Sequence, residues 1–315
     1  MYACHAHFQG KRTIDRMEST DQTTLGPLRF QSLASGSSGN CYLLQFGTET
    51  ILIDCGIGIR AIALALQTWG CSERALTSLL ITHEHSDHVL ALSSLQRKSV
   101  PIATTRGTAN ALGLAGGSYR KLTHLEPVEF GNVTVLPIPT SHDAAESVGL
   151  IIRAGDQSIG IMTDLGEITD VVTDLAATVD LLVLESNHDR EMLRNGPYPS
   201  HLKRRVAGKH GHLSNDQAAS LIGDIVTRTG GPSEIWLGHL SATNNTPQLA
   251  AQTTIERMAK MECMLRFPYW PEEDQGPSGA DRPNVPDNLA LVNMVETCQR
   301  GPETYLTEMQ FKRED

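Results

Sequence analysis

The sequence has no stretch that could anchor it in a membrane. Its apolar runs all fall short of the ~18 residues that a membrane-spanning helix requires. The first 28 residues also lack the apolar core of a secretory signal. These absences predict a cytoplasmic protein that does not bind a membrane.

Closely spaced cysteine pairs are missing too. The six cysteines are scattered along the chain, and none forms a C-x-x-C pair. Small secreted proteins use dense cysteine patterns as a disulfide framework, whereas proteins of the reducing cytoplasm keep free thiols. The pattern therefore favours free thiols.

The chain also lacks an excess of positive charge. It carries 26 Lys and Arg against 36 Asp and Glu, a net charge of −10. Proteins that bind polyanions without specificity are usually basic. The composition counts weakly against a nucleic-acid substrate, so any such contact must depend on a local basic patch or on bound cations.

What remains is the composition of an ordinary globular protein of 315 residues, 40% hydrophobic and 20% charged. We expect residues 1–27 to form a disordered tail, in which Met17 could be the true start. Residues 28–315 are expected to form a single domain. Near 268–288 an acidic, proline-rich stretch predicts an exposed insert or loop.

Short strand patterns alternate with helical ones through most of the chain. Strands are predicted at 28–34, 41–46, 50–56, 75–83, 100–105, 133–142, 148–155, 158–166, 179–187, 234–241 and, near the end, 304–311. Helices are predicted at 59–70, 106–113, 166–176, 188–196, 198–208, 214–230 and 246–262. This arrangement favours an α+β fold, a four-layer αβ/βα sandwich whose strand ends gather at one edge.

The stretch ITHEHSDHVLAL, residues 81–92, concentrates metal-binding side chains. Directly after an apolar strand come His83, His85, Asp87 and His88. A lone histidine at a strand end is usually a hydrogen-bonded structural residue. For the H-x-H-x-D-H unit metal binding is favoured, because clustered imidazoles without a metal repel one another when protonated.

Three further candidates, His142, Asp164 and His239, also stand at or near the ends of predicted strands. Imidazole and carboxylate ligands suit Zn²⁺ above all, and Mn²⁺ or Fe²⁺ as the share of carboxylates rises. Five histidines and two carboxylates are too many for one tetrahedral ion but fit two. Asp164 would then be the bridge and Asp87 a terminal ligand.

The string THEHSDHV resembles the signature of the metallo-β-lactamase fold, and the three later candidates follow in the order of that family's ligands. The resemblance implies one ion held by His83, His85 and His142, a second held by Asp87, His88 and His239, and a bridge at Asp164. Asp54, in ILIDCG, matches the buried acid that braces the metal loop. Taken alone, Asp54 could be an ordinary turn residue.

Four strings narrow the resemblance: SLASGSSGNCYLL, LESNHDREMLRNGPYP, LKRRVAGKHGHLSNDQAA and LGHLSATNNTPQLA. Together they are similar to the YycJ/WalJ-type branch, bacterial single-domain proteins described as 5′→3′ exonucleases acting on DNA. The similarity covers roughly residues 28–260, and the tail and the acidic insert fall outside it. No long insert that could clamp a substrate separates Asp164 from His239.

Several segments could bind a phosphodiester. The Gly/Ser loop at 35–40 could cradle a phosphate, with Ser37, Ser38 and Asn40 as contacts, or could be a simple hairpin turn. A basic run could hold a nucleic-acid backbone or form a solvated helix face; it contains Lys203, Arg204, Arg205, Lys209 and His210. Ser241, beside the last ligand, is a further candidate contact.

His188 and His212 are candidates for catalysis alongside Asp87. Either could donate a proton to a leaving 3′-oxygen or clamp a phosphate. Both could instead be structural, since Ser214 and Asp216 are typical of a helix N-terminus.

Our first hypothesis is a phosphodiesterase with two divalent ions, Zn²⁺ or Mn²⁺, in which a metal-bridging hydroxide attacks phosphorus. The resemblance makes it a 5′→3′ exodeoxyribonuclease in DNA maintenance, with DNA favoured over RNA. The alternatives are a thioesterase of the glyoxalase kind, an RNA-processing nuclease and a noncatalytic metal-stabilised module. The last is disfavoured because the ligand set is complete. The sequence does not determine the oligomeric state.

Overall fold

A computed structural model describes residues 26–114, 119–260 and 307–308. Most of the predicted tail at 1–27, the predicted insert at 268–288 and most of the predicted strand at 304–311 lie outside these residues. The two described residues of that last strand do pair with the first strand of the fold.

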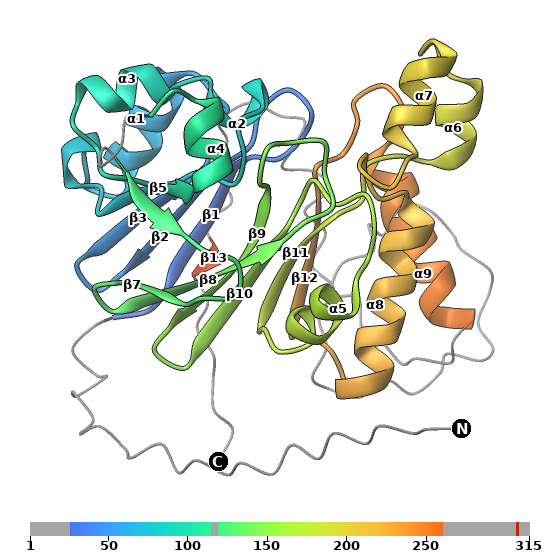
Figure 1. The fold of residues 1–315 in the computed structure, drawn as a ribbon. Helices are drawn as coiled ribbons and strands as arrows, with labels where there is room; N and C mark the ends of the chain where they lie inside the picture. The colour runs from blue at the N-terminus through green and yellow to red at the C-terminus, as the bar shows by residue number, and fades with distance from the viewer. Residues whose placement is uncertain (1–25, 115–118, 261–306, 309–315) are drawn as a thin grey trace, which may run out of the picture.

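Two sheets lie face to face with helices on their outer sides (Figure 1). The first sheet has the order β13-β1-β2-β3-β4-β5-β6 and is built from β1 (Arg29–Ala34), β2 (Cys41–Phe46), β3 (Glu49–Ile53), β4 (Ser78–Leu80), β5 (Ile102–Thr105), β6 (Arg120–Leu122) and β13 (Thr307–Glu308). The second has the order β12-β11-β10-β9-β8-β7 and is built from β7 (Val128–Phe130), β8 (Val133–Pro139), β9 (Val148–Ala154), β10 (Gln157–Met162), β11 (Leu181–Glu185) and β12 (Glu234–Gly238).

The helices divide between the two sheets (Figure 1). Beside the first sheet lie α1 (Ile59–Thr68), the short 3₁₀ helix η2 (Glu73–Ala75), α2 (Ser86–Val89), α3 (Leu92–Arg97) and α4 (Arg106–Ala111). With the second sheet are α5 (Asp170–Ala176), α6 (Arg190–Asn195), α7 (Ser200–Val206), α8 (Asn215–Thr229) and α9 (Pro247–Lys260). The predicted four-layer α+β sandwich is confirmed.

Alternation along the strands separates three apolar clusters. In β2, Tyr42 and Leu44 lie in the cluster between the two sheets, whereas Leu43 packs into the cluster that contains α1. In β9, Ile152 likewise lies between the sheets and Ile151 packs toward α5 and α8. Since successive side chains of a strand point to opposite faces, strands buried on both faces must be apolar throughout.

The strand ends that carry the predicted site all lie at one edge. β10, β11 and β12 are parallel to one another, as are β3 and β4. Asp54, Asp164 and His239 follow β3, β10 and β12, with φ angles of 55°, 56° and 54°. Left-handed backbone is uncommon for residues other than glycine, and its recurrence at three strand ends marks a functional edge.

Some element boundaries differ from those predicted. α5 begins at Asp170 rather than near 166, because the Thr169 side chain accepts a hydrogen bond from Val172 N and caps the helix. α6 begins at Arg190, because Asp189 caps it in the same way. The sequence patterns missed α2, α3, β6 and β7, which are too short to show a full period.

The described part of the chain contains no helix that is long and apolar enough to cross a membrane. Of the cysteines that it covers, Cys41 and Cys55 are buried and Cys71 is partly buried, and all three are free thiols.

The close approach between Gly56 and α2 gives a test of the fold. A Cβ at Gly56 would lie 1.6 Å from the Asp87 carbonyl oxygen, a contact that requires the backbone to move. We predict that Gly56→Ala lowers the free energy of unfolding by about 1–3 kcal/mol. Gly58→Ala is the control, because a Cβ there meets nothing within 4 Å. Denaturant unfolding measures both, and equal stabilities would contradict the packing.

Candidate metal centre

The seven predicted ligands converge in the structure, although they come from separate turns and strand ends. The loop between β4 and α2 supplies His83 and His85, and α2 itself supplies Asp87 and His88. His142 follows β8, Asp164 follows β10 and His239 follows β12. Together these residues form two groups with one carboxylate between them.

The first group consists of His83, His85 and His142. One nitrogen from each lies within 4.8 Å of the others. His85 Nδ1 and His142 Nε2 are 3.2 Å apart, and the ring centroids of His83 and His85 are 4.7 Å apart. His83 and His142 are buried, whereas His85 is half-buried and opens the group to solvent.

The second group consists of Asp87, His88 and His239, again with ligand atoms within 4.8 Å of one another. Asp164 lies between the groups. Its Oδ2 is 3.2 Å from His88 Nε2, and its Oδ1 is 3.6 Å from His142 Nε2 and 3.5 Å from His239 Nε2. The two oxygens thus face both groups, as a bridging carboxylate requires.

Three imidazoles of the cluster are oriented by a hydrogen bond that each makes through its Nδ1. His88 Nδ1 donates to Asp54 Oδ2 (2.8 Å), and His142 Nδ1 donates to the Gly211 carbonyl (3.1 Å). His239 Nδ1 donates to Glu185 Oε1 (2.6 Å). A hydrogen bond at Nδ1 fixes the tautomer and aims Nε2 at the centre of the cluster, as is usual for metal-binding histidines. The predicted bracing position of Asp54 agrees with this contact.

Glu185 is a residue of the site that the sequence analysis missed. Its side chain is fully buried and accepts four hydrogen bonds, from His212 Nδ1, His239 Nδ1 and the backbone N–H groups of Leu165 and Leu213. A signal was available: Glu185 ends the apolar strand VDLLVLE, just as Asp54 ends ILID.

The buried carboxylates and imidazoles of the cluster shift one another's pKa values. Burial opposes a charged His88, but the neighbouring Asp54 and Asp164 outweigh it and raise the pKa of His88 to about 10. Burial likewise favours a neutral Glu185, but His212 and His239 lower the pKa of that carboxyl to about 2.

Three buried polar atoms in the cluster have no hydrogen-bond partner: His83 Nε2, His239 Nε2 and Asp164 Oδ2. Buried polar atoms are almost always paired, so unpaired ones that point into a common centre need another partner. Nitrogen and carboxylate oxygen donors of this kind fit a divalent metal ion. The cluster is thus suited to divalent metal binding.

The two candidate proton donors lie in different surroundings. His212 is part of the cluster: its Nδ1 is 2.8 Å from Glu185 Oε1 and 3.8 Å from Asp164 Oδ1. Its side chain remains 21% exposed. His188 is buried, its Nδ1 has no partner, and its backbone forms a bridge with Ser214.

The predicted phosphate loop is only partly open. Ser37 and Ser38 are exposed, as a phosphate contact requires. Asn40 is fully buried, and its side chain contacts Gly36, Asp87 Oδ2 (3.3 Å) and His88 Nε2 (2.9 Å). These contacts favour a role for Asn40 in positioning the second group of ligands over a direct contact with substrate.

The remaining predicted substrate contacts are Ser241 and the basic run. Ser241 is buried, and its Oγ accepts a hydrogen bond from Asn244 N within its own turn. Lys203, Arg204 and Arg205 lie on α7, and Lys209 and His210 lie on the loop that follows. Arg205 Nε donates to Asp143 Oδ2 (2.5 Å), the neighbour of His142.

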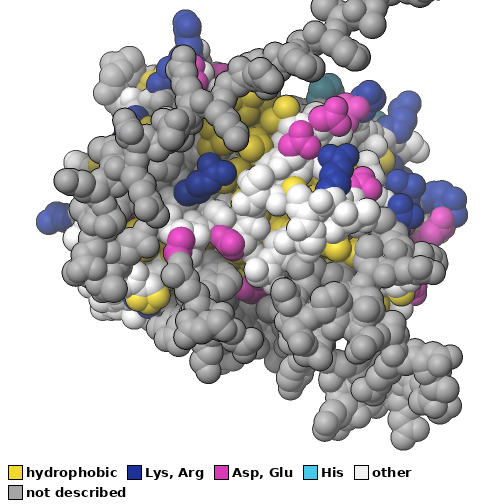
Figure 2. Space-filling view, turned by 90° about the horizontal axis from the view of Figure 1, so that it is seen from below, with side chains coloured by type: hydrophobic (Ala, Val, Ile, Leu, Met, Phe, Trp, Pro, Cys, Tyr) yellow, Lys and Arg dark blue, Asp and Glu magenta, His cyan; other side chains and the backbone are white. Residues whose placement is uncertain are grey.

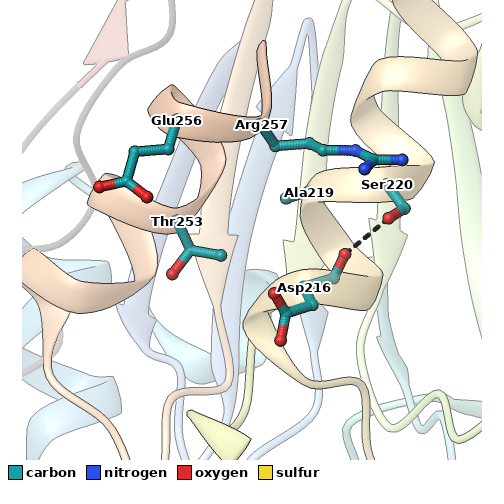
Figure 3. Close-up of a pocket in the computed structure, with 6 residues that line it drawn as sticks. All are labelled: Asp216, Ala219, Ser220, Thr253, Glu256 and Arg257. Carbon is teal, nitrogen blue, oxygen red and sulfur yellow. Dashed lines mark hydrogen bonds between the residues drawn. The ribbon is translucent and has the colours of Figure 1, made fainter. Parts of the chain in front are cut away.

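A hollow of about 160 Å³ lies between α8 and α9, away from these residues (Figure 3). It is lined by Asp216, Ala219, Ser220, Thr253, Glu256 and Arg257. None of these residues belongs to either group of candidate ligands, so the hollow takes no part in the metal centre.

The position of Glu185 gives a test of the cluster. We predict that Glu185→Gln lowers divalent-metal affinity about 10–100-fold, because the neutral amide holds His239 less firmly. Glu234→Gln is the matched control, since Glu234 lies at the opposite end of β12 and bonds Trp236. Titration of each protein with Zn²⁺ against a competing chelator measures the affinity. An unchanged affinity in Glu185→Gln would contradict the orienting contact.

Comparison with known proteins agrees with this geometry. The family model of the beta-lactamase superfamily domain matches residues 49–233. The chain is 32% identical over 243 residues to "Exodeoxyribonuclease WalJ" of Streptococcus pneumoniae serotype 2, covering 74% of this chain and 89% of that protein. It is 33% identical over 229 residues to "Exodeoxyribonuclease YycJ" of Bacillus anthracis, covering 71% and 86%.

Among solved structures, the metallo-beta-lactamase fold protein YhfI from Bacillus subtilis superposes with a TM-score of 0.58 at 17% identity, covering 73% of this chain and 93% of YhfI. This likeness concerns the fold alone. The match to the family model and the identities to WalJ and YycJ agree with the resemblance seen in the motifs. The chain therefore belongs to the metallo-β-lactamase superfamily, in the branch of the WalJ and YycJ proteins.

Proposed function

We propose that this protein is a metal-dependent phosphodiesterase that removes nucleotides from the 5′ end of DNA. The observation that carries the proposal is the pairing of a full set of ligands for two ions with His212, a half-buried imidazole beside Asp164. The names of the WalJ and YycJ relatives support an exodeoxyribonuclease over other hydrolases of the fold, and the 5′→3′ direction is what the resemblance of the motifs implies.

In this proposal the two groups of ligands hold two divalent ions, Zn²⁺ or Mn²⁺. The ions are assigned to His83, His85 and His142 for one and to Asp87, His88 and His239 for the other, with Asp164 shared between them. When bound, a pair of such ions neutralises phosphate charge and makes water acidic enough to act as a nucleophile near neutral pH.

His212 is the proposed proton donor to the leaving 3′-oxygen. Its Nδ1 is held by Glu185 Oε1, which leaves Nε2 as the ring atom that would meet a substrate. Burial opposes a charged imidazole, but Glu185 outweighs it and raises the pKa of His212. A protonated, oriented imidazole is what general-acid catalysis requires.

His188 is less suited to this role. Burial is the main reason that the pKa of His188 is lowered to about 4, which leaves the imidazole neutral near pH 7. Its carbonyl oxygen accepts a hydrogen bond from Asn215 N at the start of α8. These contacts support a structural role at the junction of two loops.

The activity can be tested with DNA labelled at its 5′ end, single-stranded and duplex, beside matched RNA and a glutathione thioester. We expect Mn²⁺- or Zn²⁺-dependent release of labelled mononucleotides from DNA, and loss of that release in Asp87→Ala. Cleavage of the thioester with intact nucleic acids would replace the proposal with a small-molecule hydrolase. Preferential cleavage of RNA would favour an RNA-processing nuclease, and metal binding without any cleavage would favour a noncatalytic module.

The role of His212 can be tested by changing the leaving group. We predict that His212→Ala slows DNA hydrolysis about 10²–10⁴-fold, because the leaving oxygen loses its proton donor. Hydrolysis of bis(p-nitrophenyl) phosphate should fall much less, since p-nitrophenolate leaves without a proton.

His188→Ala is the comparison variant for this experiment. It should show no such dependence on the leaving group if His212 is the donor. The opposite pattern, with selective loss of DNA hydrolysis in His188→Ala alone, would reverse the assignment. The metal content of each variant separates a lost proton donor from a lost ion.

A further inference from the structure

The segment 190–212 is basic in an otherwise acidic chain. It contains six Lys and Arg and one Glu, whereas the whole chain has a net charge of −10. It includes α6, α7 and the loop that ends at His212, and we call it the basic arm. In Figure 1, α6 and α7 project at the same end of the molecule as α2, which carries Asp87 and His88.

The base of the basic arm is attached to the metal centre by backbone contacts. Ser141 Oγ donates to the Lys209 carbonyl (2.7 Å), Asp143 N to the His210 carbonyl (3.0 Å) and His142 Nδ1 to the Gly211 carbonyl (3.1 Å). Gly166, two residues after Asp164, packs so closely that a Cβ there would lie 2.3 Å from the Lys209 carbonyl. The position of the arm relative to the ligands is therefore well determined.

The cations of the arm differ in their partners. Arg190 pairs with Asp216, Arg194 with Glu191 and Lys209 with Glu167. Lys203 Nζ donates only to the Arg194 carbonyl, and Arg204 Nε donates only to the Ser200 carbonyl of its own helix. Within the described part of the chain, neither Lys203 nor Arg204 forms an ion pair.

Arg205 is the cation of α7 that contacts a neighbour of the ligands. Its guanidinium is held by Asp143, whose other carboxylate oxygen is 3.5 Å from His142 Nε2 and 3.9 Å from His85 Nε2. An arginine fork can exchange one anion for another that offers two oxygens, such as a phosphate. Arg205 thus connects α7 to the metal centre.

The face seen from below can be compared with the basic arm by the charge of its side chains. Among the described residues in Figure 2, which views the molecule from below, both basic and acidic side chains are present. The basic arm carries an excess of positive charge, with six Lys and Arg and one Glu. A linear polyanion is complementary in charge to this segment.

We propose that the basic arm binds the phosphate backbone of a DNA strand and directs it into the metal centre. Lys203 and Arg204 contact phosphates on the 3′ side of the cleaved bond, and Arg205 exchanges Asp143 for the phosphate that enters the metal centre. The proposal rests on the proposed function for the identity of the strand. In this proposal α6 and α7 hold the DNA strand, a task that a separate clamping domain would otherwise perform.

The test measures binding apart from cleavage. Metal-loaded protein is titrated into a fluorescent 5′-phosphorylated DNA with phosphorothioate linkages, over a series of KCl concentrations. In the double variant Lys203→Ala with Arg204→Ala, we expect the slope of log affinity against log salt to fall by about 2, roughly 1 for each phosphate that the protein no longer neutralises. The charge-conserving double variant Lys203→Arg with Arg204→Lys should keep the slope.

Arg153→Ala is the control, because Arg153 is an exposed arginine near the end of β9 far from the ligands. An unchanged slope in the alanine double variant, or an equal fall in Arg153→Ala, would overturn the arm proposal. DNA cleavage by the wild type would in that case leave the proposed function standing. Arm-dependent binding without cleavage would support the arm and count against the proposed function, and no binding at all would overturn the arm.

Discussion

Three buried carboxylates, Asp54, Asp164 and Glu185, hold the histidines of the site in place. Each is at most 3% exposed, so each needs a positive or hydrogen-bonding partner to offset the cost of leaving water. The imidazoles provide those partners, and the carboxylates in turn keep the imidazole nitrogens oriented. Neither set would be stable alone in this apolar setting, which ties the geometry of the cluster to the two sheets that bury it.

Glu185 shows how one such residue organises several segments. The tetrapeptide GHLS occurs twice, at 211–214 and at 238–241, and both of its histidines donate to Glu185 Oε1. In the first copy the serine caps α8, and in the second it accepts a hydrogen bond from Asn244 N. The same local sequence thus presents a proposed proton donor and a proposed ligand to one carboxylate.

Much of the fold could be predicted because its determinants are local. Apolar strands such as 41–46 and 179–187 are recognisable from their composition, and the cap at Ser214 from the serine that precedes an acidic first turn with Asp216. The short elements α2, α3, β6 and β7 could not be predicted. Their residues form helix or strand because neighbouring strands and loops hold them, and intrinsic propensity contributes little over so few residues.

The sequence by itself determined the type of chemistry. Histidines and aspartates of the right kind follow apolar strands, and strand ends of a layered fold gather at one edge. Only the tertiary structure decided which residues support that chemistry, because the deciding contacts join segments far apart in the chain. His239 lies 54 residues beyond Glu185, and Arg205 lies 62 beyond Asp143. No local pattern encodes such distances. The contacts of Glu185 with two histidines, the difference between His212 and His188, and the course of the basic arm therefore emerged only from the packing of the two sheets.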